Sequence, residues 1–245
     1  MRFQFIGCGD AFGSGGRFNT CFHLVGETVN VLIDCGASSL IAMKRLGIDR
    51  NAIRAILVTH FHADHFGGIP FFMLDAQFFS RRTEPLIVAG PRGLPAWYER
   101  VMETAFPGSA AATRKFDLSL VELEPGHPVA IAGTRVTAAQ AAHGPPGGPF
   151  LALRVEVEGR SIAYTGDTEW TDALVPAIRD CDLLVAESYF FDRQVKTHLD
   201  YATLAAQLPR LRPRRLVLTH MSEEMLARAG SLPCTVAEDG LTIAL

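Results

Sequence analysis

One short segment places four metal-binding side chains within six residues. It reads His60-Phe61-His62-Ala63-Asp64-His65 and holds three of the eight histidines of the chain. The residues before it, 53–58, form a continuous apolar run that predicts a β-strand covered on both faces. Residues two apart in an extended segment point to the same side, so His60 and His62 are predicted to face one ion. Asp64 and His65 follow where the chain turns, and they are predicted to hold a second ion nearby.

Three further candidate ligands lie where other predicted strands end. They are His143 before Gly144-Pro145-Pro146, Asp167 in Thr165-Gly166-Asp167-Thr168, and His220 in Leu218-Thr219-His220. A single histidine or aspartate at such a place is more often a cap or turn residue, so only their joint occurrence with the six-residue segment makes them candidates. Val58-Thr59-His60 and Leu218-Thr219-His220 both end a strand with a histidine, which predicts two similar halves that meet at one edge.

The apolar and β-branched runs predict strands gathered in groups, with helices between them. Strands are predicted at residues 2–6, 20–25, 29–33, 53–58, 85–88, 118–123, 134–141, 150–157, 161–164, 183–186 and 215–218, with a last one near the C-terminus. Helices are predicted at residues 40–46, 71–79, 95–105, 172–178 and 201–208. This order predicts an α/β fold in which two packed sheets carry helices outside, a four-layer αββα sandwich. We expect a single domain over residues 1–245, because no low-complexity linker interrupts the chain.

The composition excludes several other classes of protein. Apolar residues make up 48% of the chain, yet no run is long enough for a membrane-spanning helix, and the first residues lack a signal-peptide pattern, which makes the cytoplasm the expected location. The five cysteines are widely spaced and form no Cys-x-x-Cys pair, so neither a disulfide framework nor a zinc ribbon is indicated. A net charge of −3 gives no support to nucleic-acid binding, and the one basic run, 210–215, fits a solvated surface.

With these residues in view, the chain resembles the metallo-β-lactamase superfamily from its first strand to about Met221. The resemblance lies in His60-x-His62-x-Asp64-His65 followed in order by His143, Asp167 and His220. It implies that His60, His62 and His143 bind one metal, that Asp64, His65 and His220 bind the other, and that Asp167 bridges the two. Such nitrogen and carboxylate ligands suit two divalent ions, with Zn²⁺ favoured and Mn²⁺, Fe²⁺ or Ni²⁺ as replacements.

Two departures narrow the class within that superfamily. His62 stands where flavodiiron proteins carry a glutamate, and Asp167 stands where zinc β-lactamases carry a cysteine, so redox and β-lactam-opening activities are disfavoured. The chain is most similar to the transfer-RNA 3′-processing nuclease (ribonuclease Z)-like phosphodiesterases. Two ions roughly 3.5–4 Å apart would lower the pKa of a shared water to about 7. Asp64 is then a candidate to orient that water or hold its proton.

His198 is the candidate proton donor for the leaving oxygen. It lies in Lys196-Thr197-His198-Leu199-Asp200-Tyr201, just before a predicted helix, and resembles the extra histidine of these nucleases. The match is partial, since Leu199-Asp200 replaces their usual Ser-Thr. The alternative is that Asp200 caps the helix and His198 is merely exposed.

The glycine-rich segment from Gly7 to Arg17 could be read as a dinucleotide-binding loop. The third glycine of that motif is Phe12 here, and predicted strands rather than a helix follow, so this reading is disfavoured. Arg17 and Asn19 are instead candidates to touch substrate, with a flexible surface loop as the alternative. Phenylalanines cluster around the metal-like segment, where core packing is favoured over a ring-stacking pocket. His23 and His127 receive no role.

We therefore expect a metallo-hydrolase that acts as a phosphodiesterase on a small phosphodiester, cyclic or nucleotide in kind. The stretch between Pro85 and Leu123 is too short and too poor in basic residues for the tRNA-gripping arm of the similar nucleases. One alternative is a lactonase or a glyoxalase-II-like thioesterase on the same metals. Another is a non-catalytic, nucleotide-binding protein. The resemblance makes a homodimer reasonable, but no interface is legible in the sequence.

Overall fold

Two seven-stranded sheets form the centre of the computed structural model, which describes all residues 1–245. The order of strands is β14-β1-β2-β3-β4-β5-β6 in the first sheet and β13-β12-β11-β10-β9-β8-β7 in the second. The strands are β1 (Arg2–Gly7), β2 (Cys21–Val25), β3 (Asn30–Ile33), β4 (Ala55–Leu57), β5 (Leu86–Pro91), β6 (Leu118–Leu123), β7 (Val129–Ile131), β8 (Thr134–Gln140), β9 (Leu151–Val157), β10 (Arg160–Tyr164), β11 (Leu183–Glu187), β12 (Leu216–Thr219), β13 (Thr235–Val236) and β14 (Thr242–Ala244).

The two sheets repeat one plan. In the first, β1, β2 and β3 pair antiparallel, and β3, β4, β5 and β6 pair parallel. In the second, β7 to β10 pair antiparallel, and β10 to β13 pair parallel. The carboxyl ends of parallel neighbours lie at the same edge of a sheet, where α/β proteins bind their ligands. The two similar halves suggested by the strand-end histidines are therefore present.

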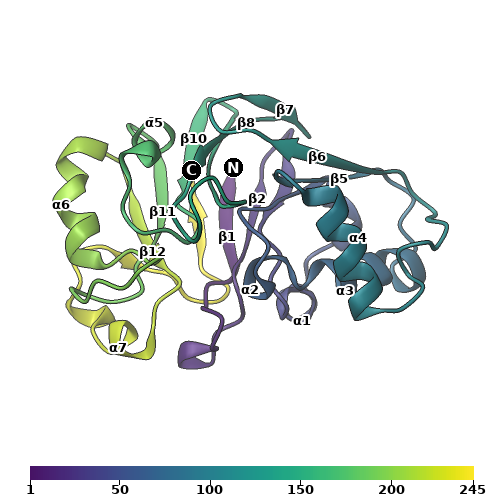
Figure 1. The fold of residues 1–245 in the computed structure, drawn as a ribbon, viewed down its shortest axis with the longest axis horizontal. Coiled ribbons are helices and arrows are strands. Elements are labelled where there is room, and N and C mark those ends of the chain that lie inside the picture. Colours follow the sequence, from purple (N-terminus) through teal and green to yellow (C-terminus); the bar gives the residue numbers. More distant parts are fainter.

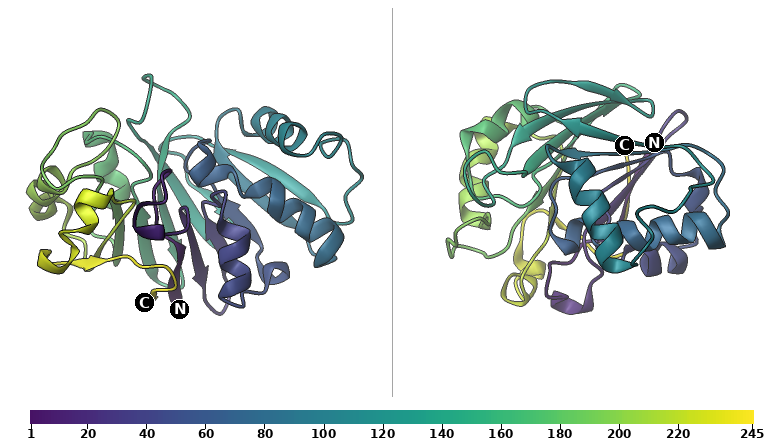
Figure 2. Two further views of the ribbon diagram at one scale, coloured as in Figure 1. Left: turned by 90° about the horizontal axis from the view of Figure 1, so that it is seen from below. Right: turned by 45° about the vertical axis from the view of Figure 1, so that its right-hand side comes forward.

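Helices cover the outer face of each sheet (Figures 1 and 2). Beside the first sheet lie α1 (Ser39–Arg45), α2 (Ala63–Phe66), α3 (Ile69–Leu74) and α4 (Leu94–Ala105), and beside the second lie α5 (Val175–Ile178), α6 (Tyr201–Leu211) and α7 (Glu223–Leu226). One apolar core unites side chains of both sheets, such as Phe22 and Tyr164, and each helical layer has a core of its own. These layers confirm the predicted four-layer αββα sandwich.

The ends of the chain meet at the edge of the first sheet, where β14 pairs antiparallel with β1 (Figure 1). The last strand thus closes on the first. None of the helices combines the length and the apolar character that a bilayer crossing requires.

Several element boundaries differ from those predicted. The strand predicted at 53–58 is limited to β4, and the helix predicted at 71–79 begins at Ile69 and ends in a π-helical turn, Asp75–Phe79. Helix α6 continues past Leu208 to Leu211 although Pro209 lies inside it. A proline lacks the N–H that an interior helical position needs, and Pro209 lies in the last turn of the helix.

Candidate metal centre

The six-residue segment changes from strand to helix in its middle. β4 ends at Leu57, and His62 is the N-cap of α2 with extended backbone angles of φ −65° and ψ 151°. His60 and His62 therefore leave the chain from an extended stretch, whereas Asp64 and His65 lie in the first turn of a helix. This change of geometry lets one short segment supply two separate groups of side chains, as the sequence predicted.

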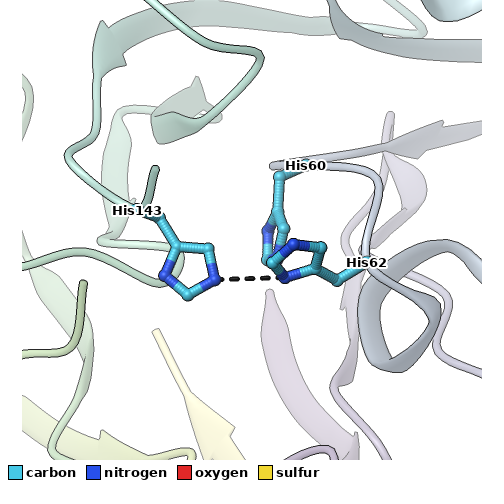
Figure 3. A group of neighbouring side chains, drawn as sticks. All are labelled: His60, His62 and His143. Atoms are coloured by element: carbon cyan, nitrogen blue, oxygen red, sulfur yellow. Dashed lines mark hydrogen bonds between the residues drawn. The ribbon is translucent and has the colours of Figure 1, made fainter. Parts of the chain in front are cut away.

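The first group consists of His60, His62 and His143, whose nearest ring nitrogens lie within 4.8 Å of one another. The nitrogens closest to each other are His143 Nε2 and His62 Nδ1, at 3.1 Å. Figure 3 shows the three imidazoles converging from two separate parts of the chain. His60 and His143 are buried and His62 is exposed, so the group opens to solvent on the His62 side.

The second group consists of Asp64, His65, Asp167 and His220, all buried. His220 Nε2 lies 3.2 Å from Asp64 Oδ2 and 3.4 Å from His65 Nε2. His65 Nε2 lies 3.3 Å from Asp64 Oδ2. The structure thus brings together side chains from positions 64 to 220, a span that crosses both sheets.

Asp167 lies between the two groups. Its Oδ2 is 3.3 Å from His220 Nε2, 3.7 Å from His143 Nε2 and 4.0 Å from His60 Nε2, and its Oδ1 is 3.3 Å from His65 Nε2. One carboxylate therefore faces both sets of imidazoles. This is the position that the resemblance implied for a bridging ligand.

Atoms without partners indicate that the cluster fits a cation. His60 Nε2 and Asp167 Oδ1 are buried and have no hydrogen-bond partner within the protein. Burial lowers the pKa of His60 well below its ordinary value, and neighbouring histidines lower it further, so His60 is a neutral imidazole with a free lone pair. Buried polar atoms are rarely left unpaired, and nitrogen and carboxylate donors of this kind suit a divalent metal ion. The His and Asp cluster thus fits a divalent-metal site.

Asp34 orients His65 from behind, and sequence reasoning missed it. Its Oδ2 lies 2.7 Å from His65 Nδ1, and it also accepts hydrogen bonds from the backbone N–H and the hydroxyl of Thr59. Burial lowers the pKa of His65, but the charges of Asp167 and Asp34 outweigh it and raise that pKa well above its ordinary value. Asp34 follows β3 directly, so the strand-end rule that selected Asp167 could have found it.

His143 is held in one tautomer by the chain on its far side. Its Nδ1 donates to the backbone carbonyl of Thr197 at 2.7 Å, which leaves Nε2 without a proton and directed at His62 and Asp167. Thr197 has a left-handed backbone with φ 72°, and the next residue is His198. The same turn therefore positions two histidines of the site.

His198 lies beside the cluster and is not a freely exposed side chain. Its Nδ1 is 2.8 Å from Glu187 Oε2, its side chain is 22% exposed, and its ring centroid is 4.8 Å from that of His143. Burial lowers the pKa of His198, but the hydrogen bond and charge of Glu187 outweigh it, so the pKa is raised. Asp200 also caps α6 by accepting from Thr203 N–H. The predicted Asp200 cap is therefore present, whereas His198 is not merely exposed.

Glu187 is the second site residue that sequence reasoning missed. It ends β11, is fully buried, and also accepts a hydrogen bond from the backbone N–H of Thr168, next to Asp167. An apolar strand that ends in a glutamate is the signal that could have revealed it, because buried carboxylates are rare unless they are paired. Glu187 thus connects His198 to the loop that carries Asp167.

The glycine-rich loop is held in place by hydrogen bonds within the protein. Asn19 donates to the Asp10 carbonyl through its side-chain N–H and accepts from Ser38 N–H, so its amide is used within the protein. Strand β2 follows the loop, as expected, and there is no helix to receive a pyrophosphate. Of the phenylalanines near the segment, Phe66 and Phe72 are core residues, whereas Phe71, Phe78 and Phe79 are exposed. The core interpretation therefore holds for only some of them.

Comparisons with known proteins agree with this geometry. The family described as "Anti-Pycsar protein Apyc1" matches residues 1–236. A ribonuclease Z of Methanosarcina acetivorans is 28% identical over 91% of this chain and 88% of its own length, and one of Myxococcus xanthus is 30% identical over 100% and 98%. The crystal structure of the short form of human tRNase Z superposes with a TM-score of 0.80 at 25% identity, covering 100% of this chain and 99% of that one. The chain therefore belongs to the Apyc1 family, within the ribonuclease Z-like branch of the metallo-β-lactamase superfamily, and is a metal-dependent hydrolase.

Proposed function

We propose that this hydrolase is a phosphodiesterase that acts on a small phosphodiester or a nucleotide. Two divalent cations, Zn²⁺ above all, would be held by the seven residues gathered around Asp167: His60, His62 and His143 on one side, Asp64, His65 and His220 on the other, and Asp167 between them. Such cations acidify water and stabilise negative charge on a phosphoryl group when bound.

The observation that carries the proposal is the His198–Glu187 pair beside this cluster. Hydrolysis joins a water oxygen to phosphorus, breaks the P–O bond to the leaving alcohol, and needs a proton on the leaving oxygen. His198 is the candidate donor of that proton: burial lowers its pKa, but its hydrogen bond to Glu187 and the charge of that carboxylate outweigh burial and raise it. Asp64, gathered with His65, Asp167 and His220 in the second group, is the carboxylate that would orient the attacking water.

The same pair favours a phosphodiester over a thioester. An alkoxide is a poor leaving group and gains much from a proton donor, whereas a thiolate leaves readily because the pKa of a thiol is only about 8.5. A buried glutamate that raises the pKa of one histidine is useful for the first reaction and of little use for the second. The lactonase and thioesterase alternatives are therefore second to the phosphodiesterase.

Chain length supports a small substrate. The alignment with the ribonuclease Z of Methanothermobacter thermautotrophicus spans 301 positions, whereas this chain has 245 residues in all, so that relative has segments with no counterpart here. Between β5 and β6 this chain has only α4 and the connecting residues 106–117. Together with the net charge of −3, this argues against a large RNA as the main substrate.

A substrate panel tests the proposal. The zinc-loaded protein is assayed with bis(p-nitrophenyl) phosphate, nucleoside 3′,5′-cyclic phosphates, a precursor tRNA, an acyl-homoserine lactone and a glutathione thioester. We expect kcat/KM to be highest for the small phosphodiesters. His127→Ala, which removes a histidine 75% exposed and outside the cluster, serves as the matched control for His198→Ala and should keep full activity.

Two results would overturn parts of this proposal. Hydrolysis of the lactone or thioester without any phosphodiester cleavage would assign the centre to carbonyl chemistry. A higher kcat/KM for precursor tRNA than for every small diester would show that the substrate is a large RNA.

A further inference from the structure

The ring of Tyr189 lies against the ring of His198, the candidate proton donor. Their centroids are 4.7 Å apart and their planes differ by 27°, which is the geometry of a stacked pair. Tyr189 is half-buried and belongs to none of the groups of candidate metal ligands. An aromatic side chain therefore contacts the site at a position to which the reaction described above gives no role.

Strand β11 places Glu187 and Tyr189 on the same side of the chain. The strand ends at Glu187, and its parallel pairing with β12 continues through the N–H of Ser188, which donates to the carbonyl of Thr219 at 3.0 Å. Residues two apart in such a stretch point to one side. The carboxylate of Glu187 reaches Nδ1 of His198, and the ring of Tyr189 covers the face of the same imidazole.

These two contacts restrain different motions of His198. A hydrogen bond to one ring nitrogen fixes the position of that atom but lets the ring tilt about it. A stacked aromatic neighbour opposes the tilt, because offset stacking is one of the favoured arrangements of two rings. The ring of His143 adds a contact that is nearly perpendicular, with centroids 4.8 Å apart and planes 75° apart. Nε2, the nitrogen that Glu187 does not bind, is therefore held in one direction.

Tyr189 is itself fixed by the segments that carry the site. Its N–H donates to the carbonyl of Leu199, the neighbour of His198, at 2.9 Å. Its carbonyl accepts from the N–H and from the hydroxyl of Ser222, at 3.1 Å and 2.6 Å, two residues after His220. The backbone of Tyr189 thus joins the His198 segment to the His220 segment, and its ring has a firm base.

We propose that Tyr189 is a positioning residue, whose ring holds the plane of His198 so that Nε2 stays directed at the leaving oxygen. This rests on the proposed phosphodiesterase function and adds a residue that acts through the proton donor. The contact is made by the ring, so phenylalanine serves in its place and an aliphatic side chain does not.

Two variants at this position test the proposal. Tyr189→Phe keeps the ring, and Tyr189→Leu removes it. For a diester with an alkoxide leaving group, Tyr189→Leu should lower kcat about two- to tenfold, the size expected for one aromatic pair, and leave KM unchanged. For bis(p-nitrophenyl) phosphate, whose leaving group is stable without a proton, kcat should stay at the parent value. Tyr189→Phe should match the parent with both substrates. Tyr201→Leu removes a tyrosine of the same helical layer that packs on Phe191, and this control should also match the parent.

A measurement without turnover separates failure of this inference from failure of the proposed function. In zinc-loaded protein with isotope-labelled histidine, the NMR signal of the proton on Nδ1 of His198 is assigned by its absence from His198→Ala. Its exchange with solvent should be faster in Tyr189→Leu than in the parent and in Tyr189→Phe, because a ring free to tilt leaves Glu187 more often.

The outcomes separate as follows. Equal exchange in the parent and both Tyr189 variants, or an equal loss of kcat for both substrates in Tyr189→Leu, would overturn the positioning role. A parent that cleaves no phosphodiester, yet shows the difference in exchange, would end the phosphodiesterase proposal and keep the restraint of His198 by Tyr189.

Discussion

Asp34 lies outside the candidate metal cluster but fixes the orientation of His65, one of the candidate ligands. It is buried, has a left-handed backbone with φ 57°, and binds both His65 and Thr59. We expect Asp34→Ala to weaken zinc affinity about 10- to 100-fold, because His65 loses the partner that fixes its ring. Competition with a chromogenic chelator measures this affinity. Asp182→Ala, which removes a carboxylate that caps Ser161 far from the cluster, is the control and should bind zinc normally.

The proton-donor role proposed for His198 predicts a loss of activity that depends on the leaving group. In His198→Ala, kcat should fall about 10²- to 10⁴-fold for a diester with an alkoxide leaving group, because that oxygen lacks its proton. For bis(p-nitrophenyl) phosphate, whose leaving group is stable without a proton, the loss should be far smaller. Metal content by atomic spectroscopy should equal that of the parent. An equal loss for both substrates would mean that His198 acts on binding or structure instead.

At this scale the sequence predicted the residues of the cluster and missed those that hold them. The local spacing of His60 to His65 is strong enough to stand alone, and His143, Asp167 and His220 could be added because each follows a strand. Asp34 and Glu187 also follow strands, but their importance depends on which side chain lies across from them. That is set by the pairing of strands distant in sequence, which local patterns do not contain.

At the scale of the elements, ion pairs of Asp75 link helix α1 to the π-helical turn that follows α3. Asp75, at the start of the π-helical turn, lies 2.9 Å from Lys44 of α1 and 2.8 Å from Arg50. Burial would raise the pKa of Asp75, but the hydrogen bonds from Arg50 and Lys44 outweigh it and lower that pKa. A carboxyl group whose pKa is lower in the folded than in the unfolded chain stabilises the folded chain at pH values above its unfolded-state pKa. This stabilisation is lost as the pH falls through the folded-state pKa.

We therefore expect Asp75→Asn to lower the free energy of unfolding by about 1–3 kcal/mol at neutral pH. The gap between variant and parent should shrink as the pH drops below the ordinary aspartate range. Urea unfolding at a series of pH values measures it. Asp172→Asn breaks an exposed pair with Arg210 and should change little. If the difference in free energy of unfolding between Asp75→Asn and the parent stayed constant down to acidic pH, the ion pairs of Asp75 would not be its cause.

The elements themselves were predicted well where they are long and poorly where they are short. Strand β7 has only three residues and was not predicted from the sequence. It is defined by a hairpin in which Ala132 and Gly133 both take left-handed backbone angles, with φ 47° and 86°. Strand β13, with two residues, exists because β12 lies beside it. Tertiary pairing rather than local pattern creates such strands.

On the scale of the whole molecule, the candidate ligands tie the two sheets together. His60 to His65 follow β4 of the first sheet, whereas Asp167 and His220 follow β10 and β12 of the second. Metal should therefore stabilise the folded chain as a unit. At a concentration about one hundred times Kd the gain is about 2.7 kcal/mol, which corresponds to a rise in Tm of roughly 5–10 °C.

Differential scanning calorimetry of chelator-treated and zinc-loaded protein checks this. The double variant His60→Ala, His220→Ala removes one donor from each sheet and should lose most of the shift. A full shift in that variant would place the stabilising ion elsewhere on the protein.

The placement of His220 just after β12, so late in the chain, sets an order of events during synthesis. By the time residue 65 has left the ribosome, all four candidate donors of the first half are available, yet they can form only an incomplete shell. His143, Asp167 and His220 must emerge and the second sheet must assemble before that shell closes. A nascent or truncated chain that stops short of them should hold cations only weakly, so tight metal capture becomes a late marker of maturation.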